Sequence, residues 1–480
     1  MKTKKIVLFS LLFSGCTLIP SVGPDYEKPE SVADEKLPKN FISSVNNFTP
    51  ETKTAINDIS SWWKIFNDIE LNTLVDRALT QSYDLRTAFS RVQQAGYQRS
   101  IAFSSFLPGI GFQGEVDRSR GSGNAFGPPG FIGQTVTNYR LGFVAQWELD
   151  FFGGSRRDFE ASLAKFESAE DAFLSTRIAI VSEVTSKYFD LIGLRKRIEA
   201  SNTSVIAQEE SLKLAKEKYD AGLTTELDLL AATTRVGQTK ANREELNRQS
   251  SLLENEISIL LGGYPGEVKV TTDDFRGEIE QLVPSVGIPA EALARRPDVK
   301  QAEAELKAAT AEIGGAKSEW FPKISIGAGY GRAGIRSYEL FDRPSKTWSL
   351  IPSIQFPIFA AGKILANVNL QEEEQIEALL KYEQTVKKAI NEVENSMISL
   401  NREKAAYDEL TRVVESSHKA TELAKELYKN GLADFQRVLD SQLSEAEIMD
   451  RFAASKARLF IYVTMLYRSI GGGYEVASAE

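Results

Sequence analysis

The sequence predicts an α+β membrane protein in which each chain contributes a small β-sheet to a shared barrel and two pairs of very long helices to a periplasmic extension. Three observations support this prediction: an internal repeat, four amphipathic strand-like segments, and long proline-free stretches with heptad spacing. The repeat is clearest where LAKEKYDAGL at residues 214–223 returns as LAKELYKNGL at residues 423–432. Neither half is expected to fold alone.

The N-terminus has the pattern of an export signal. Lysines precede an apolar run at residues 6–13, and small residues then lead directly into Cys16, the only cysteine of the chain. The apolar run is too short to span a bilayer. Because the arrangement resembles a bacterial lipoprotein signal, we predict a signal peptide over residues 1–15, covalent lipid on Cys16, and an extended lipidated segment over residues 16–60. An ordinary secretory signal with an incidental cysteine is the alternative.

Composition argues against several classes of function. The net charge is −9, and this excess of acid disfavours a nucleic-acid partner. One histidine and one cysteine leave little material for metal sites or nucleophilic catalysis. The histidine, His418, lies in a charged helical stretch and is expected to be a solvated surface residue. We therefore predict no enzyme activity, no catalytic residue, no metal and no cofactor other than the lipid on Cys16.

Four segments alternate between apolar and small or polar residues, and aromatic residues gather near their ends. Each has about the length of a tilted strand that crosses a bilayer. A soluble antiparallel sheet with one wet face is the alternative. Open sheet edges cannot lie in lipid, and four strands are too few to close a barrel, so several copies of the chain must contribute. The predicted strands cover residues 108–118, 137–149, 322–332 and 346–358.

Two further expectations concern the strand segments. Pro352 cannot donate to a strand ladder, so we expect a bulge or kink there. The link at residues 119–135 is longer than its counterpart at residues 333–346, which places the length difference of the repeat in a hairpin loop, where insertions cost little. Both loops are expected to face the outside of the cell.

The helical stretches are longer than a single globular core can cover. Phe159, Phe166 and Phe173 recur every seven residues, which is coiled-coil spacing. Gly222 and Gly431 interrupt the return helices early and are explained by positive φ or by close helix approach. The outgoing helices are predicted at about residues 154–199 and 362–412, and the return helices at about residues 204–261 and 416–470. The domain organisation is a first repeat at residues 61–275, a second at residues 276–470, and a tail at residues 471–480.

Several motifs in a fixed order resemble a known group. CTLIPSVGPDYEKPE at residues 16–30, SWWKIFNDIELNTLVDRAL at residues 61–79, IPAEALARRPDVKQAEAEL at residues 288–306 and the two Y-x-x-G-L segments are similar to the lipoprotein branch of the TolC-like outer-membrane efflux family. The resemblance covers essentially the whole mature chain. Ser82-Tyr83 departs from the family pattern at a helix start.

The resemblance implies a homotrimer with a twelve-stranded β-barrel and a tapered α-helical tunnel in the periplasm. It implies the exit duct of a tripartite efflux pump, passively conducting drugs or other small toxic compounds. The implied partners are a periplasmic adaptor, an inner-membrane transporter of the RND type and outer-membrane lipid. A type I-like channel for secreted protein is one alternative, and a lipid-anchored periplasmic coiled coil with a structural role is another.

The resemblance also suggests how the periplasmic mouth is closed. Tyr428 and Asp440 match family positions that hold the mouth shut, and Asp228 occupies the corresponding place in the first hairpin. Arg437 stands where some relatives have an acidic residue. Our hypothesis is that Arg437 or Tyr428 engages Asp228 while three Asp440 carboxylates meet at the axis; solvated residues of a hairpin bend are the alternative. The adaptor is expected to contact the hairpin tips at Gly222, Leu223, Gly431 and Leu432.

Overall fold

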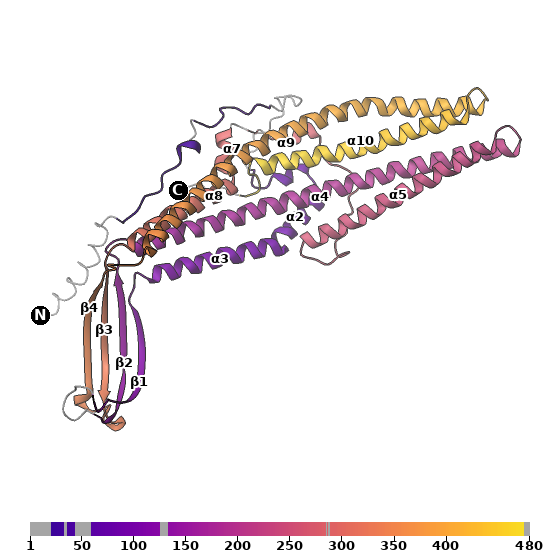
Figure 1. The fold of residues 1–480 in the computed structure, drawn as a ribbon. Helices are drawn as coiled ribbons and strands as arrows, with labels where there is room; N and C mark the ends of the chain where they lie inside the picture. Colours follow the sequence, from indigo (N-terminus) through magenta and orange to yellow (C-terminus); the bar gives the residue numbers. More distant parts are fainter. Residues whose placement is uncertain are drawn as a thin grey trace. The chain divides into compact units, whose positions relative to one another are not determined.

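A computed structural model describes residues 21–32, 36–43, 59–124, 133–284, 286 and 289–474 (Figure 1). Cys16 and the predicted signal peptide lie outside these residues. The elements in chain order are η2 (Glu30–Val32), η4 (Trp62–Phe66), α2 (Ile69–Gln81), α3 (Tyr83–Ser104), β1 (Gly109–Arg120), β2 (Thr135–Leu149), α4 (Gly154–Asp220), α5 (Glu226–Leu260), α6 (Ile279–Leu282), α7 (Pro289–Arg295), α8 (Pro297–Ser318), β3 (Lys323–Gly334), η5 (Ser337–Glu339), η6 (Arg343–Ser345), β4 (Lys346–Gln355), α9 (Lys363–Lys429) and α10 (Phe435–Ser469).

The chain forms two compact units, and neither corresponds to one sequence repeat. The first unit takes in residues 1–29, 91–169 and 301–382, and the second takes in residues 30–90, 170–300 and 383–480. Each unit therefore draws on both halves of the sequence, as expected if neither half folds alone. The division into repeats at residues 61–275 and 276–470 stays a prediction about sequence history.

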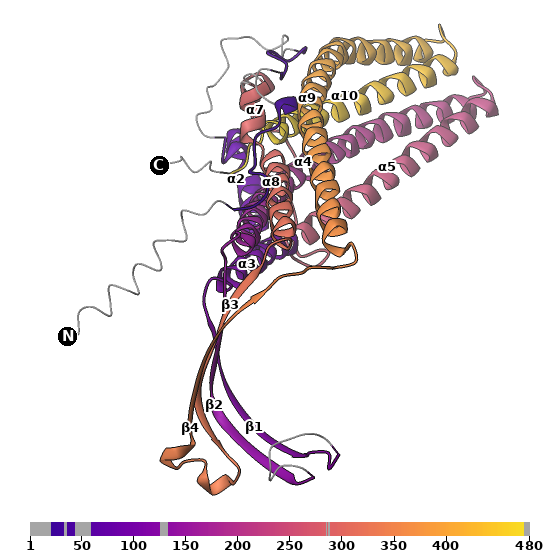
Figure 2. The same ribbon diagram turned by 60° about the vertical axis from the view of Figure 1, so that its left-hand side comes forward.

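The first unit contains one antiparallel sheet in the order β1-β2-β3-β4. The four segments that alternate in the sequence are confirmed as strands, and each boundary except one differs from the prediction by no more than two residues. The exception is the end of β4 at Gln355, two residues before Pro357, which lacks an N–H for the ladder. The strands coil strongly along their length (Figure 2).

The bulge expected at Pro352 is wrong. Pro352 lies directly opposite Ile326, and the register of β3 and β4 runs unbroken from Lys323↔Gln355 to Arg332↔Lys346. Within the chain, β4 is an edge strand, and an edge strand tolerates a residue without an N–H.

The register sorts the side chains into an apolar face and a polar face. Paired residues share a face, so Phe112, Phe143, Tyr330 and Trp348 form one aromatic row across all four strands. Three large apolar residues break the alternation by falling on the polar face. Val144 is opposite Gly111 and Gly329, Ile351 is opposite Gly327, and Val136 is opposite Ser119 at the loop end.

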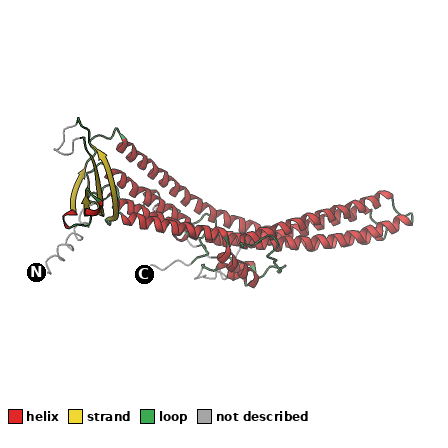
Figure 3. Cartoon of the chain, turned by 90° about the horizontal axis from the view of Figure 1, so that it is seen from below, coloured by secondary structure: helices red, strands yellow, loops and turns green. Residues whose placement is uncertain are grey.

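The long helices turn later than predicted. Helices α4 and α9 have 67 residues each, and α5 and α10 have 35 each, so the breaks expected near residues 200–204 and 412–416 are wrong. The Thr203 and Ser204 hydroxyls donate to carbonyls one turn back, at 3.2 and 3.0 Å, which lets a turn-like composition stay helical. The chain reverses instead at residues 221–225 and 430–434 (Figure 3). Among the described residues, no helix has a stretch long and apolar enough to cross a membrane.

The core of the second unit is built around the aromatic segment η4. Phe66 lies edge-on to Phe189 of α4, with ring centroids 4.7 Å apart, and 5.9 Å from Phe460 of α10. Next to it, Asp68 caps α2 by accepting from the N–H groups of Glu70 and Leu71. The buried Tyr188 hydroxyl donates to the same carboxylate at 2.6 Å. These contacts fix η4 and α2 against α4 and α10.

Candidate functional site

Both helical turns have the same backbone design. The N–H of Leu223 donates to the Lys218 carbonyl at 2.8 Å and that of Gly222 to the Tyr219 carbonyl at 2.9 Å, which is a Schellman C-cap. The second turn repeats the pattern, with Leu432 donating to Leu427 at 2.8 Å and Gly431 to Tyr428 at 3.0 Å. The G-L pair of the repeated motif is therefore a helix stop.

The two glycines serve backbone geometry alone. Gly222 has φ of 70° and Gly431 φ of 74°, values that side chains with a Cβ disfavour. A Cβ at either position would meet nothing within 4 Å, so close helix approach is not the reason. The leucines that follow, Leu223 and Leu432, are each 75% exposed. Each turn thus leaves one apolar side chain exposed at its surface.

A small aromatic cluster couples the two turns. Tyr428 is 4% exposed and packs against Phe435, with ring centroids 5.0 Å apart. From the other hairpin, Lys218 places its Nζ 4.2 Å from the centre of the Tyr428 ring and donates to the Tyr428 carbonyl at 2.5 Å. A cation over an aromatic face is attracted by the ring quadrupole. Lys218 is a residue that our sequence reasoning missed.

The predicted gate residues are only partly brought together. Asp228 accepts the hydroxyl hydrogen bond of Thr224 at the start of α5. The buried Tyr428 hydroxyl has no hydrogen-bond partner in the described part of the chain. Burial raises the pKa of the Tyr428 phenol; the nearby Thr224 hydroxyl opposes this effect, and the Asp228 carboxylate adds to it. Tyr428 and Asp228 thus share one cluster without the direct bond that we expected.

Arg437 and Asp440 lie outside this cluster. Both are exposed on α10. The Arg437 N–H donates to Asp434, the N-cap of α10, at 3.0 Å, and the Asp440 carboxylate accepts from Gln436 at 2.8 Å. An ion pair of Arg437 with Asp228 is not formed among the described residues, and the meeting of three Asp440 carboxylates stays a prediction about the assembled protein.

We predict that Lys218→Met loosens the coupling of the turns. The substitution removes a cation–π contact and a charge-assisted hydrogen bond, so it should shift the predicted periplasmic mouth toward its open state by about 1–2 kcal/mol, or roughly 5- to 30-fold. Leakage of antibiotics into cells and open-channel probability in planar bilayers measure the shift. Lys216→Met, an exposed position on the same helix, is the matched control; equal leakage in the two variants contradicts the role of Lys218.

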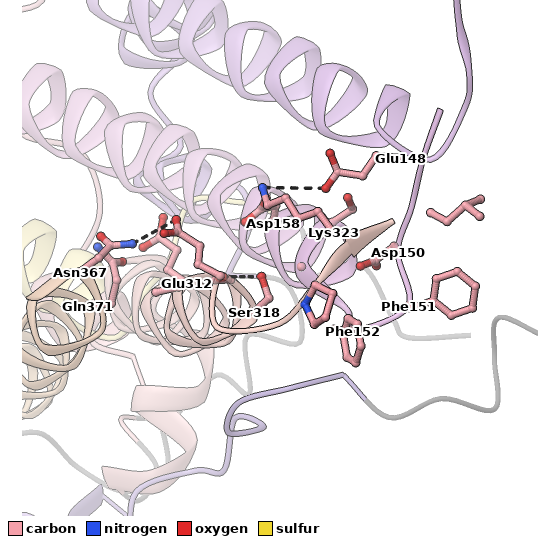
Figure 4. Close-up of a pocket in the computed structure, with 17 residues that line it drawn as sticks. Glu148, Asp150, Phe151, Phe152, Asp158, Glu312, Ser318, Lys323, Asn367 and Gln371 are labelled. Carbon is pink, nitrogen blue, oxygen red and sulfur yellow. Dashed lines mark hydrogen bonds and ion pairs between the residues drawn. The ribbon is translucent and has the colours of Figure 1, made fainter. Parts of the chain in front are cut away.

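A second candidate site is a cavity of about 300 Å³ in the first unit, where strands meet helices (Figure 4). Its lining is strongly acidic, and Lys323 lies 3.9 Å from Glu148. Asp150 is satisfied by Arg156, which donates from its backbone N–H at 2.9 Å and from Nε at 3.1 Å. In the described residues, no group of three or more His, Cys, Asp or Glu side chains could hold a metal ion. The carboxylates of the lining are Glu148, Asp150, Asp158, Glu312 and Glu319.

Among the carboxylates of this cavity, Asp158 has a raised pKa. Burial raises the pKa of its carboxyl above the ordinary 3.8, and the Asp150 charge raises it further, against the opposing effect of Lys323. The ionised form is therefore disfavoured in the fold, and wild-type stability rises as the pH falls through the raised pKa.

We predict that Asp158→Asn melts at a higher temperature than wild type at pH 7, because the amide cannot ionise. The gain should shrink as the pH is lowered from 7 through the raised pKa of the wild-type Asp158 carboxyl, which then becomes protonated. Thermal melting of the purified protein across this range measures the difference. As a control, Asp150→Asn loses its bond to Arg156 and should melt lower than wild type; a pH-independent difference for Asp158→Asn contradicts the account.

Comparisons with known proteins agree with this geometry. The family model described as "Outer membrane efflux protein" matches residues 74–263 and 288–472. Outer membrane protein OprJ of Pseudomonas aeruginosa is 30% identical over 476 residues, which cover 98% of this chain and 95% of OprJ. The cation efflux system protein CusC of Escherichia coli K12 is 27% identical over 467 residues, covering 97% of this chain and 98% of CusC.

A solved structure extends the agreement to the fold. The outer-membrane channel OprN is 30% identical and superposes with a TM-score of 0.85, covering 94% of this chain and 99% of OprN. The superposition spans nearly the whole of both chains. The chain belongs to the outer membrane efflux protein family.

Proposed function

We propose that this protein is the exit channel of an efflux pump and that three copies assemble into one pore in the outer membrane. The observation that carries the proposal is the sheet, which has an exposed apolar face, a polar face and two edges that no strand of the described chain covers. Unpaired edge amides cost several kcal/mol each in lipid. Pairing β1 of one copy with β4 of the next satisfies both edges, and three sheets supply twelve strands.

The two faces suit the two environments of such a pore. On the apolar face, Leu350 is 63% exposed and Tyr330 also 63% exposed, as lipid contact would require. The polar face carries glycines and serines, including Gly327, Gly329 and Ser349. Small side chains on that face favour the curvature of a closed barrel and leave its interior open.

A lipid anchor on Cys16 would be held close to the first unit. Arg157, buried at the start of α4, donates to the Val22 carbonyl at 3.1 Å and to the Asp25 carboxylate at 2.6 Å. The Val22 N–H in turn donates to Phe152. These bonds fix a segment that begins within ten residues of Cys16, and they support an anchor on the same membrane as the barrel.

The proposed partners are an adaptor and an inner-membrane transporter of the RND type. Relatives carry names such as "Solvent efflux pump outer membrane protein SrpC", from Pseudomonas putida, and "Cation efflux system protein CusC", so related chains are named for different cargoes. The exposed Leu223 and Leu432 at the turns are the proposed adaptor contacts. The channel itself conducts passively and requires no cofactor; drugs or other small toxic compounds are the proposed cargo.

Conductance tests the proposal. The purified full-length protein should run as a heat-resistant trimer and should produce discrete conductance steps in a planar bilayer. A monomer that binds membranes without conducting would instead support a lipid-anchored structural protein.

A further inference from the structure

We propose that the loop end of the sheet binds the phosphorylated headgroup of a lipid in the outer leaflet. The binding surface, here called the outer cationic patch, is formed by Arg332 and Lys346 on the apolar face; Arg118 and Arg120 lie on the same face, farther out along β1. The inference rests on the proposed function, which places the apolar face in the membrane and the hairpin loops outside the cell.

The register brings the first two cations together. Arg332 lies directly opposite Lys346, and Leu141 lies opposite Arg332 on the other side. The aromatic row lies on the same face, two residues along each strand toward the helices, and includes Tyr330 and Trp348. Like charges that face each other across two strands repel and destabilise the sheet. A bound anion between Arg332 and Lys346 would turn this repulsion into attraction.

Charge is segregated between the two faces. On the polar face, cations have acidic partners: Arg140 is 3.4 Å from Glu115 and Lys323 is 3.9 Å from Glu148. On the apolar face, the described strands carry no acidic residue at all, and every basic residue lies at the loop end. The chain as a whole is acidic, with a net charge of −9. The exclusively basic charge of this face therefore differs from the overall composition.

The contacts within the chain leave the charge of the patch uncompensated. Arg332 donates to the Asp342 carbonyl at 3.1 Å and lies 5.7 Å from the centre of the Phe341 ring, and both of these partners are neutral. No ion pair of Arg118, Arg120, Arg332 or Lys346 with a carboxylate occurs among the described residues of the sheet and its loops. A phosphate from outside the chain fits this unmet charge.

An amphiphile fits the surface better than a free anion does. Directly below the cations, Tyr330 is 63% and Trp348 is 79% exposed, so apolar surface continues from the patch toward the bilayer centre. Acyl chains can lie on the aromatic row while a phosphate lies between Arg332 and Lys346, at the depth where cations and aromatic side chains anchor membrane proteins.

The experiment compares two lipids on the full-length trimer in detergent. Binding of diphosphoryl lipid A and of its dephosphorylated form is measured by native mass spectrometry. We expect wild type to bind the dephosphorylated form at least tenfold more weakly. Each cation near a membrane surface contributes a factor of about five, so the double variant Arg332→Gln/Lys346→Gln should bind diphosphoryl lipid A about 30-fold more weakly than wild type.

Arg140→Gln is the matched control, since it removes one cation at the same sheet end from the polar face, and it should bind as wild type does. Equal binding of the two lipids by wild type, or undiminished binding by the double variant, overturns the inference. If the double variant does not fold, the inference is tested by the single variant Lys346→Gln, which should bind diphosphoryl lipid A more weakly than wild type, and by the comparison of the two lipids on wild type. Wild-type conductance in phosphatidylcholine bilayers separates the cases: a conducting protein without lipid preference rejects only this inference, and a non-conducting one rejects the proposed function.

Discussion

Leu350→Arg is expected to abolish the heat-resistant trimer and its conductance. Leu350 lies on the apolar face of β4, opposite Ala328 and between the levels of Trp348 and Pro352. An arginine near the bilayer midplane of a barrel costs about 2–4 kcal/mol. Three copies of the chain multiply this to roughly 6–12 kcal/mol for the assembly, which is as large as the net folding stability of most proteins.

The neighbouring residue provides the control for Leu350→Arg. Ser349 lies opposite Gly329 on the polar face, where the barrel interior is wet, so Ser349→Arg should assemble and conduct with altered ion selectivity. Outer-membrane extraction, unheated gel electrophoresis and single-channel recording compare the two variants. If both variants assemble equally well, the apolar face does not contact lipid.

Trp62→Ala is expected to cost about 3–5 kcal/mol of folding free energy, the range for large aromatic side chains removed from a core. Trp62 is 1% exposed and stacks on Tyr467 of α10, with ring centroids 5.1 Å apart and planes within 6°. It also lies edge-on to Phe66 at 6.3 Å. The cavity left behind would separate η4 from α10, so the second unit should unfold at much lower denaturant concentration.

Chemical denaturation followed by circular dichroism measures the effect of Trp62→Ala. Tyr264→Ala, at an aromatic residue of the same unit that is 80% exposed, is the control and should change stability by less than about 0.5 kcal/mol. A Trp62 variant that is as stable as this control would show that the aromatic cluster around η4 does not hold the unit together.

The strands were the part of the fold most accessible from sequence. Alternation over ten or more residues is a strong signal, because a shift of one residue would reverse both faces of the sheet. The helix turns were less accessible. Residues 199–205 contain serine, asparagine and threonine, a composition typical of a turn, yet Thr203 and Ser204 bond back to the helix and Val205 is buried. Tertiary packing decided the outcome there.

The candidate site was predicted unevenly, for two physical reasons. A helix interruption at Gly222 and Gly431 was predictable, because a positive φ is a local property; the predicted helix boundaries did not place the reversal of the chain at these glycines. The contact between Lys218 and Tyr428 joins two hairpins, so it cannot be derived from either hairpin alone. The repeat nevertheless marks the position, because Lys218 stands where the second copy has Leu427. The gate hypothesis for Arg437 and Asp440 involves neighbouring copies of the chain, so a single sequence constrains it weakly.

Single-particle electron microscopy of the purified full-length protein in lipid nanodiscs tests the central claim most directly. The account predicts three copies around one axis, with β1 of each copy hydrogen-bonded to β4 of the next and Leu350 facing lipid. A monomer with an unpaired β4 edge, or a sheet whose apolar face is covered by protein away from the membrane, would contradict it.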